Sequence, residues 1–266
     1  MADKANLIDP KTLSMIPTDS DIATPELVLA VQRLALTKLG VGIDGIYPLD
    51  FDEVDSSAYA FLPRHIADNK KELLADSLVL GRMFPQVLPY FQIVDTEGRY
   101  LVYRRIGKES GLHEKYSIGV GGHIDTWDSF WLYSGSHYQP KVATNSVGLH
   151  RRSGLQDITA TGAIRELKEE INYIHHGQFE FDRVISTFED DTSVMHIGLP
   201  LELHLTPEPT DKAWDVDTLN NTFSKLKFEE AEFPGVEWLT KEELKAKLKE
   251  EGVVFEAWSR LLVEAM

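Results

Sequence analysis

The sequence contains no cysteine among its 266 residues, which excludes disulfide bonds, thiolate metal sites and cysteine nucleophiles. No run approaches the roughly 20 consecutive apolar residues that a membrane-spanning helix needs. The start of the chain is polar, carries acidic residues early and lacks the apolar centre of a secretory signal. We therefore expect a cytoplasmic protein that does not enter a membrane.

Basic residues are too few to balance the acidic ones: 27 Lys and Arg stand against 43 Asp and Glu, a formal charge of −16. An acidic surface repels a phosphate backbone, so stable nucleic-acid binding is disfavoured. A small phosphorylated ligand remains compatible with this charge if a metal ion reverses the local field. With 42% hydrophobic residues the chain has the composition of an ordinary globular protein. Its partners could include a second copy of itself in a homodimer.

Local patterns predict a chain in which helices and strands are mixed. Pro25 in a first turn and the apolar run after it predict a helix over residues 24–39, ended by Gly40. Residues 41–66 are interrupted by glycine and proline and are expected to be irregular. The mixture indicates an α/β layered fold with a mixed sheet. Strands are predicted at 87–94 and 100–104, joined by the turn Asp95-Thr-Glu-Gly98, and at 116–120, 179–187, 194–205 and 236–239. Further helices are predicted at 68–80, 159–171 and 255–265, and one opens at Thr240 with Glu243 in capping-box position.

The segment Arg165-Glu-Leu-Lys-Glu-Glu-Ile171 places three carboxylates on one side of a predicted helix. Glu166 lies three residues before Glu169 and four before Glu170, so the three side chains are neighbours. Crowded carboxylates repel one another unless a cation lies among them, and hard oxygen ligands suit Mg²⁺ or Mn²⁺. The alternative is a solvated acidic helix face, since short motifs have many false matches. An apolar stripe would hold the opposite face of this helix against a core: Ala160, Ala163 or Ile164, Leu167 and Ile171.

A second informative segment, residues 115–125, combines a short strand with the pair Gly121-Gly122, where the backbone can approach a ligand closely. Together the two segments resemble the two halves of the Nudix box, Gly-x5-Glu-x7-Arg-Glu-U-x-Glu-Glu-x-Gly-U, in which U is aliphatic. The first half matches at Gly122. The second half matches at Arg165, Glu166, Leu167, Glu169 and Glu170.

The resemblance covers about residues 60–266. The segment Gly235-Val-Glu-Trp238 and the helix predicted after it resemble the closing strand and helix of Nudix domains. The stretch from Phe61 to His123 resembles a little-characterised bacterial branch of predicted Nudix phosphoesterases. The resemblance implies a Nudix-like α/β/α sandwich with a mixed sheet as a catalytic domain over residues 61–266, preceded by residues 1–60 as an N-terminal extension with one helix.

The sequence departs from the box in three ways. Counted from the glycine of the first half, the box glutamate falls on Asp128, and 36 residues separate Asp128 from Arg165 where the box has seven, an insertion of 29 residues at about 129–157. Counted back from Arg165, the glutamate falls on Asp157, which is also placed to be a helix N-cap. Asn172 replaces the final glycine, and Asn tolerates the left-handed conformation of a helix end. Either aspartate can therefore take the place of the box glutamate.

Roles for the box residues follow from the resemblance. It implies that Glu166, Glu169 and Glu170 are metal ligands, with the Gly122 carbonyl as a further one, and that Mg²⁺ or Mn²⁺ is the cofactor. Glu169 and Glu170 are then also catalytic residues. Arg165 would orient the glutamates through salt bridges and would not touch the substrate.

An acid from a later loop often acts as the base or as an extra ligand in this family. The resemblance nominates Glu230 or Glu229 for this role, with Glu189 and Asp190 as rivals; the alternative for each, and the one favoured for any single residue, is an exposed acid. 

Candidate substrate contacts are basic residues at strand ends and a histidine beside the glycine pair. Arg104, Arg105 and Lys115 could bind phosphate, since Arg offers a bidentate fork and Lys a point charge; the alternative for each is a solvated side chain. His123 could contact phosphate or metal, or form a structural hydrogen bond. The inserted segment could form a lid that stacks on a base or a surface hairpin, and it is rich in aromatic side chains: Trp127, Trp131, Tyr133, His137 and Tyr138.

The implied function is a metal-dependent pyrophosphohydrolase that cleaves a diphosphate linkage in a nucleoside diphosphate derivative or a related small molecule. Metal ions would neutralise phosphate charge and lower the pKa of bound water, and a carboxylate would take the proton. The alternative is a catalytically weak or inactive Nudix-like module that binds a nucleotide as a sensor. A prenyl-diphosphate isomerase of the same superfamily is disfavoured, because that resemblance would need a catalytic cysteine and this chain has none.

Overall fold

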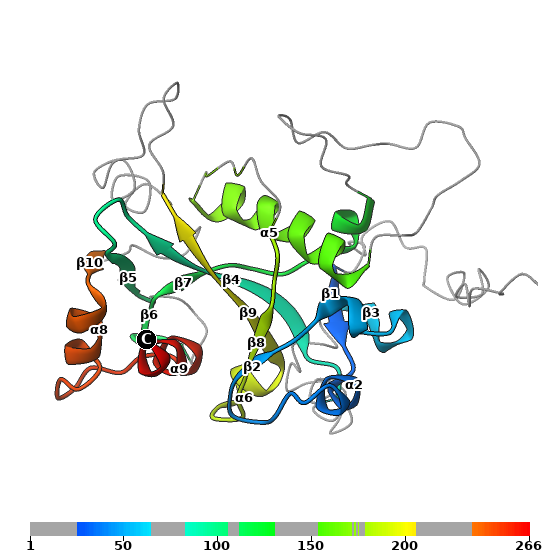
Figure 1. The fold of residues 1–266 in the computed structure, drawn as a ribbon, viewed down its shortest axis with the longest axis horizontal. Coiled ribbons are helices and arrows are strands. Elements are labelled where there is room, and N and C mark those ends of the chain that lie inside the picture. The colour runs from blue at the N-terminus through cyan, green and yellow to red at the C-terminus, as the bar shows by residue number, and fades with distance from the viewer. Residues whose placement is uncertain are drawn as a thin grey trace, which may run out of the picture.

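The computed structural model describes residues 26–64, 83–105, 112–130, 154–171, 173, 175, 179–205 and 236–266. These residues form a curled mixed sheet with helices on both sides (Figure 1). Some sequence predictions lie outside them, among them the helix over 68–80, the box position Asn172, the candidate bases Glu229 and Glu230, and most of the insertion at 129–157.

A parallel pair of long strands forms the centre of the sheet. In this pair β4 (Gln86–Val94) and β9 (His196–His204) are in register over nine residues. The remaining pairs among the described strands are antiparallel, so the sheet is mixed, as expected from the sequence. Along the main path the strand order is β10 (Glu237–Leu239), β5 (Tyr100–Arg104), β4, β9, β8 (Arg183–Ser186) and β2 (Gly45–Pro48).

The hairpin between β4 and β5 was predicted from its turn residues, and the structure confirms it. The Asp95 carboxylate accepts hydrogen bonds from the backbone N–H groups of Glu97 and Arg99, at 2.9 Å and 2.8 Å. Gly98 has a φ of 78°, a left-handed conformation that glycine adopts without strain. The local chemistry of the turn therefore sets the register of the two strands.

The helix predicted over residues 24–39 is wrong in its first part. Leu27–Val31 is the strand β1, which pairs with β3 (Tyr59–Pro63) along its whole length, and only Arg33–Lys38 is helical, as α2. Val28 through Val31 are completely buried. A short apolar run buried on both faces has no period that separates a strand from a helix, which explains the error. The region expected to be irregular likewise holds β2, β3 and the short helices η1 (Phe51–Glu53) and η2 (Ser56–Ala58).

Two hydrophobic cores lie on opposite faces of the sheet, and alternate residues of β4 supply them. Phe91 packs in the core shared with α5 (Leu155–Ile171), whereas Tyr90 packs in the core shared with α8 (Lys241–Lys247) and α9 (Ala257–Ala265). Figure 1 shows α5 on one side of the sheet and α8 and α9 on the other. This arrangement is the α/β/α sandwich expected from the sequence.

The C-terminal elements follow the predicted pattern closely. Thr240 caps α8 in a capping box: its hydroxyl accepts from the Glu243 N–H at 3.2 Å, and the Glu243 carboxylate accepts from the Thr240 N–H at 2.8 Å. The terminal helix predicted at 255–265 is α9. The predictions of α8 and α9 both depend on residues that are close together in the chain, so they could be made from the sequence.

The strand predicted at 116–120 is divided in two. Tyr116–Ser117 forms β6, which pairs with β5, and Gly119–Val120 forms β7, which pairs with β4. The chain then passes Gly122 and enters the short helix η3 (Thr126–Phe130). The glycine pair therefore directly follows the sheet.

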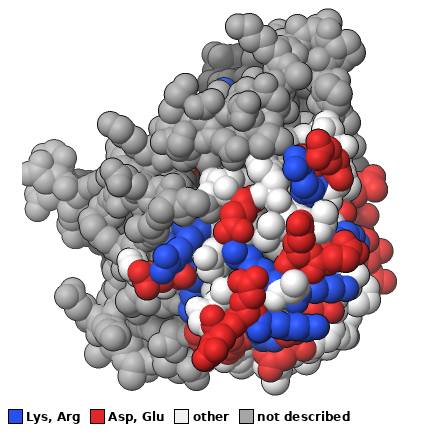
Figure 2. Space-filling view, turned by 90° about the vertical axis from the view of Figure 1, so that its left-hand side faces the viewer, with Lys and Arg blue, Asp and Glu red and all other residues white. Residues whose placement is uncertain are grey.

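Charges of both signs are interleaved on the face drawn in Figure 2. Ion pairs at this end of the molecule include Lys247 with Glu237 and Lys241 with Glu202. This face therefore presents no continuous basic area in the part of the chain that the structure describes.

Across the same described residues, no helix has the length and apolar character needed to cross a membrane.

Candidate metal-binding site

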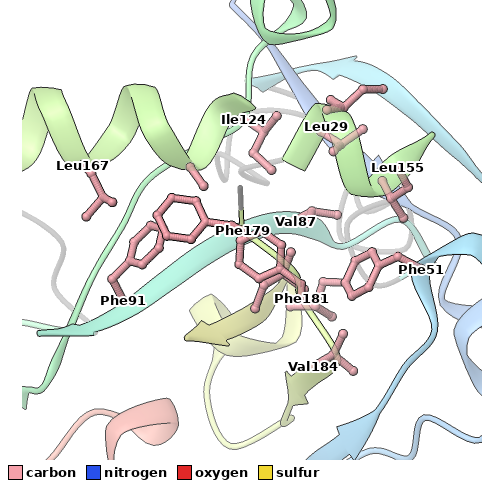
Figure 3. Packing of buried hydrophobic residues seen from close by; sticks show 14 of the residues in the cluster. Leu29, Phe51, Val87, Phe91, Ile124, Leu155, Leu167, Phe179, Phe181 and Val184 are labelled. Atoms are coloured by element: carbon pink, nitrogen blue, oxygen red, sulfur yellow. The ribbon is translucent and has the colours of Figure 1, made fainter. Parts of the chain in front are cut away.

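The candidate site is built on α5, whose buried face fixes the helix on the sheet. Ala163, Leu167 and Ile171 are each buried and belong to the core that includes Phe91 of β4. In Figure 3, Leu167 points from α5 toward the sheet. With 3.6 residues per turn, Glu166 and Glu170 lie beside this buried face, whereas Glu169 lies on the exposed side of the helix.

The three glutamates lie in different environments. Glu166 is buried, with 6% of its surface exposed, Glu170 is half-buried, and the Glu169 side chain is 58% exposed. Burial raises the pKa of Glu166 and of Glu170 to about 7 in each case, and the neighbouring arginines Arg165 and Arg105 only partly oppose this. Two carboxylates that are poorly solvated when charged would be stabilised by a nearby cation.

Arg165 connects the helix to the loop after the glycine pair. One terminal nitrogen, Nη1, donates to the Glu166 and Glu169 carboxylates at 2.7 Å and 2.8 Å. The other, Nη2, donates to the His123 carbonyl at 2.6 Å and to Asp128 Oδ2 at 2.9 Å, while Nε donates to Asp128 Oδ1 at 3.0 Å. The planar guanidinium thus holds four partners in one geometry, which suits an orienting role.

The two aspartates that were alternatives in sequence have different positions in the fold. Asp128 is buried, its side chain is 0% exposed, and it forms the bidentate pair with Arg165. Asp157 is exposed and lies inside the first turn of α5, which begins at Leu155, so it is not the N-cap. The structure therefore places Asp128, counted from Gly122, opposite Arg165.

Two glycines allow these groups to approach one another. A Cβ atom on Gly122 would lie 2.1 Å from Glu166 Oε2, and one on Gly162 would lie 2.8 Å from Asp128 Oδ2. Any side chain at Gly122 would therefore displace the glutamate. Gly122 was identified from the sequence and Gly162 was not, although a glycine inside a predicted helix is a recognisable sign of close packing.

Asp125 was also missed. Its N–H donates to Asp128 Oδ2 at 2.9 Å, and its own Oδ1 accepts from the Asp128 N–H at 3.3 Å. One carboxylate oxygen of Asp125 lies 4.0 Å from Arg165 Nε. The Asp-x-x-Asp spacing at the start of η3 was the available signal for this reciprocal contact.

Of the three bases proposed as phosphate contacts, two pair elsewhere. Arg104 forms an ion pair with Glu114 at 3.3 Å, and Lys115 forms one with Asp190, also at 3.3 Å. Arg105 is the base that acts on the candidate site, because its charge opposes the rise in the pKa of Glu170.

His123 contributes its backbone to the site. Its carbonyl accepts from Arg165, while its ring is largely buried and lies edge-on to His196, with ring centres 5.9 Å apart. Burial lowers the pKa of His123 to about 3, so its ring is neutral at physiological pH.

The rival bases have structural partners away from α5. Glu189 forms an ion pair with Arg260 of α9 at 2.6 Å. Asp190 caps the short helix α6 (Asp191–Val194) by accepting from the Ser193 N–H at 2.7 Å. Neither residue is brought to the glutamates through these contacts.

The donor set suits a hard divalent cation, although among the described residues no three His, Asp or Glu side chains already converge on one point. Arg165 binds Oε1 of Glu166, while Oε2 of the same carboxylate faces the backbone at Gly122. Glu170 is one helical turn away. The assignment of Glu166, Glu169, Glu170 and the Gly122 carbonyl as metal ligands stays a prediction.

A pair of variants tests which aspartate supports Arg165. Asp128→Asn should lower the free energy of unfolding by about 2 kcal/mol, because the buried guanidinium loses its charged partner. Asp157→Asn, the same change on an exposed site, should stay within about 0.5 kcal/mol of wild type. Urea unfolding measures both. Equal effects of the two changes would contradict the placement of Asp128.

The fold is similar to that of a solved Nudix protein, although the sequence alone finds no match. No family model matches the sequence, and no curated protein matches it. The solved structure of Tm1382, "a putative Nudix hydrolase", is similar over 90% of this chain and 97% of that one, with a TM-score of 0.55 and 20% identity. A MutT protein from Methanosarcina mazei Go1 is similar over 67% of this chain and 90% of that one, with a TM-score of 0.33 and 16% identity. The layered sheet, the position of α5 and the likeness to Tm1382 together show that this chain has a Nudix-like fold.

Proposed function

We propose that this protein is a metal-dependent hydrolase of the Nudix type, which cleaves a diphosphate linkage in a nucleoside diphosphate derivative or a related small molecule. The observation that carries the proposal is the Arg165 cluster. One guanidinium joins the loop after Gly122 to two glutamates of α5, with Asp128 as its buried counter-charge. A solvated acidic helix face would not need this arrangement.

Different residues would bind the metal ion and orient its ligands in such a reaction. Glu166, Glu169 and Glu170, with the Gly122 carbonyl, would hold Mg²⁺ or Mn²⁺. When bound, the cation neutralises phosphate charge and makes water a better nucleophile. Arg165 keeps Glu166 and Glu169 in orientation.

Two further roles complete the proposal. Arg105, whose charge acts on Glu170, is the base best placed to bind a substrate phosphate. Glu230 or Glu229 remains the carboxylate that we propose as the proton acceptor, on the family resemblance alone.

The experiment is a substrate panel with controlled metal. Purified full-length protein is incubated with nucleotide sugars, dinucleoside polyphosphates and nucleoside triphosphates, with Mg²⁺ or Mn²⁺, and products are separated by chromatography. We expect at least one diphosphate to be cleaved and the turnover to fall to background on chelation, because the carboxylates cannot neutralise phosphate themselves. Turnover that is unchanged by chelation would refute the metal-dependent proposal.

The sensor alternative has its own outcome in this experiment. A protein that binds a nucleotide tightly, as measured by calorimetry, and cleaves none of the panel would be a binding module. Since a sensor does not require three clustered carboxylates, we favour the hydrolase.

A further inference from the structure

We propose that Ser259 and Glu256, at the start of α9, are positioning residues for the turn at Gly121-Gly122 and, through it, for the Glu166 carboxylate. They lie on the face of the sheet opposite α5, so they would act through the strand between them and the site. The proposal rests on the function proposed above, because it concerns the same candidate metal site.

A buried polar network connects α9 to the sheet. Ser259 Oγ lies 2.6 Å from the Tyr90 hydroxyl, donates to Glu256 Oε1 at 2.7 Å and accepts from the Ile118 N–H at 2.9 Å. Glu256 also contacts the Tyr90 hydroxyl directly. Ser259 and Glu256 are both buried within an otherwise apolar core. Removing one member would leave other buried polar groups without a partner, which is costly.

The network is attached at the point where the strand changes partners. Ile118 lies between β6, which pairs with β5, and β7, which pairs with β4, so its N–H points to the side chain of Ser259 and not to a neighbouring strand. The backbone before α9 also pairs with β6: the Tyr116 N–H donates to the Val254 carbonyl at 2.8 Å, and the Glu256 N–H donates to the Tyr116 carbonyl at 3.0 Å. The start of α9 therefore fixes the path of the chain as it leaves β6.

The chain between Ile118 and the turn that contacts Glu166 is short and closely packed. Only Gly119 and Val120 of β7 separate Ile118 from the glycine pair. A Cβ on Gly121 would lie 1.8 Å from the Pro89 carbonyl oxygen, and one on Gly122 would lie 2.1 Å from Glu166 Oε2. Because backbone and carboxylate are already this close, a small displacement of the strand would move the turn against Glu166.

The test compares local order with metal binding in the full-length chain. Ser259→Ala removes the hydroxyl that accepts from Ile118. We expect amide hydrogen exchange at residues 118–122 to become about tenfold faster without metal, while β8 is unaffected. We also expect the affinity for Mn²⁺ alone, measured by calorimetry, to fall about tenfold, which is the scale seen when a group supporting metal ligands is lost.

Ser193→Ala is the matched control, since it removes a buried capping hydroxyl from α6 that has no hydrogen bond to residues 117–122. It should change exchange near residues 190–195 and leave residues 118–122 and Mn²⁺ affinity as in wild type. Exchange at 118–122 that is unchanged by Ser259→Ala, or is accelerated equally by the control, would overturn the proposal.

Failure of the variant to fold and failure of the proposed function can each be distinguished from failure of this proposal. If Ser259→Ala does not fold, Tyr90→Phe removes one hydroxyl from the same network, and the same comparison decides. A wild-type chain that binds no Mn²⁺ would refute the proposed function, whereas the exchange data would still show whether α9 positions the turn.

Discussion

Glu170→Gln is expected to lower the turnover of a confirmed substrate about a hundredfold, a loss of roughly 3 kcal/mol in transition-state stabilisation. The amide keeps the size of the side chain and nearly the same helix propensity, but it removes one ligand charge. Glu170 is half-buried one turn from Glu166, so the change acts at the candidate site and not on a solvated face. Steady-state kinetics at saturating Mg²⁺ would measure it.

Asp157→Asn is the matched control for this variant. It is also an acid-to-amide change on α5, but at an exposed position two residues after the helix begins. It should leave turnover and metal affinity unchanged. A Glu170→Gln protein that is as active and as responsive to metal as Asp157→Asn would remove the basis of the functional proposal.

The same variant has an expected effect on stability without metal. Burial raises the pKa of Glu170 to about 7, so the folded state retains a proton that the unfolded state releases near pH 4. The folded state then binds more protons at this group, so the contribution of Glu170 to the stability of the wild-type apo protein falls between about pH 4 and pH 7. Gln does not titrate, so Glu170→Gln should gain in melting temperature relative to wild type across this window. Thermal melts with chelator at several pH values would measure the difference.

A fragment of residues 55–266 is expected to be unfolded, although the sequence resemblance suggested that residues 1–60 are accessory. The fragment lacks β1, which pairs with β3 and β4, and β2, which pairs with β8. The Leu29 N–H also donates to the Ile124 carbonyl at 2.8 Å, beside the candidate site. A domain is stable by only about 5–15 kcal/mol in total, and each buried side chain lost with this segment contributes about 1.5–3 kcal/mol. The buried side chains that are lost include Val28, Leu29, Val31, Leu36, Val41, Leu49, Phe51 and Val54.

Circular dichroism and the dispersion of amide proton signals would measure folding of the fragment. Point variants in the intact chain supply the control: Leu29→Ala, at a fully buried position, should cost about 3 kcal/mol, and Leu34→Ala, at a position 65% exposed, less than about 0.5 kcal/mol. A fragment with cooperative unfolding and dispersed signals would instead support a boundary near residue 60.

Local signals account for what was correctly predicted from the sequence. The hairpin between β4 and β5 follows from Asp95 and Gly98, and the start of α8 follows from Thr240 and Glu243. The helix α5 follows from the repeat of its apolar residues, although it begins four residues earlier than predicted. Each of these signals involves residues close together in the chain, so no tertiary contact was needed to see them.

Long-range contacts account for the errors. The run Leu27–Val31 is a strand because β3 and β4 pair with its backbone, and these partners lie about 30 or more residues away in sequence. The network of Tyr90, Ser259 and Glu256 joins residues more than 160 positions apart. No local pattern identifies such contacts, because hydrophobic and polar runs are compatible with several partners.

The sequence by itself determined the layered α/β class, the helix that carries Glu166, Glu169 and Glu170, and the presence of a glycine turn to accompany it. Only the tertiary structure decided that Asp128, and not Asp157, faces Arg165, and that the segment before residue 61 completes the sheet. The physical reason is that helix periodicity and turn chemistry are set by neighbours in the chain. The pairing of a buried charge and the pairing of strands are set instead by which distant groups folding brings together.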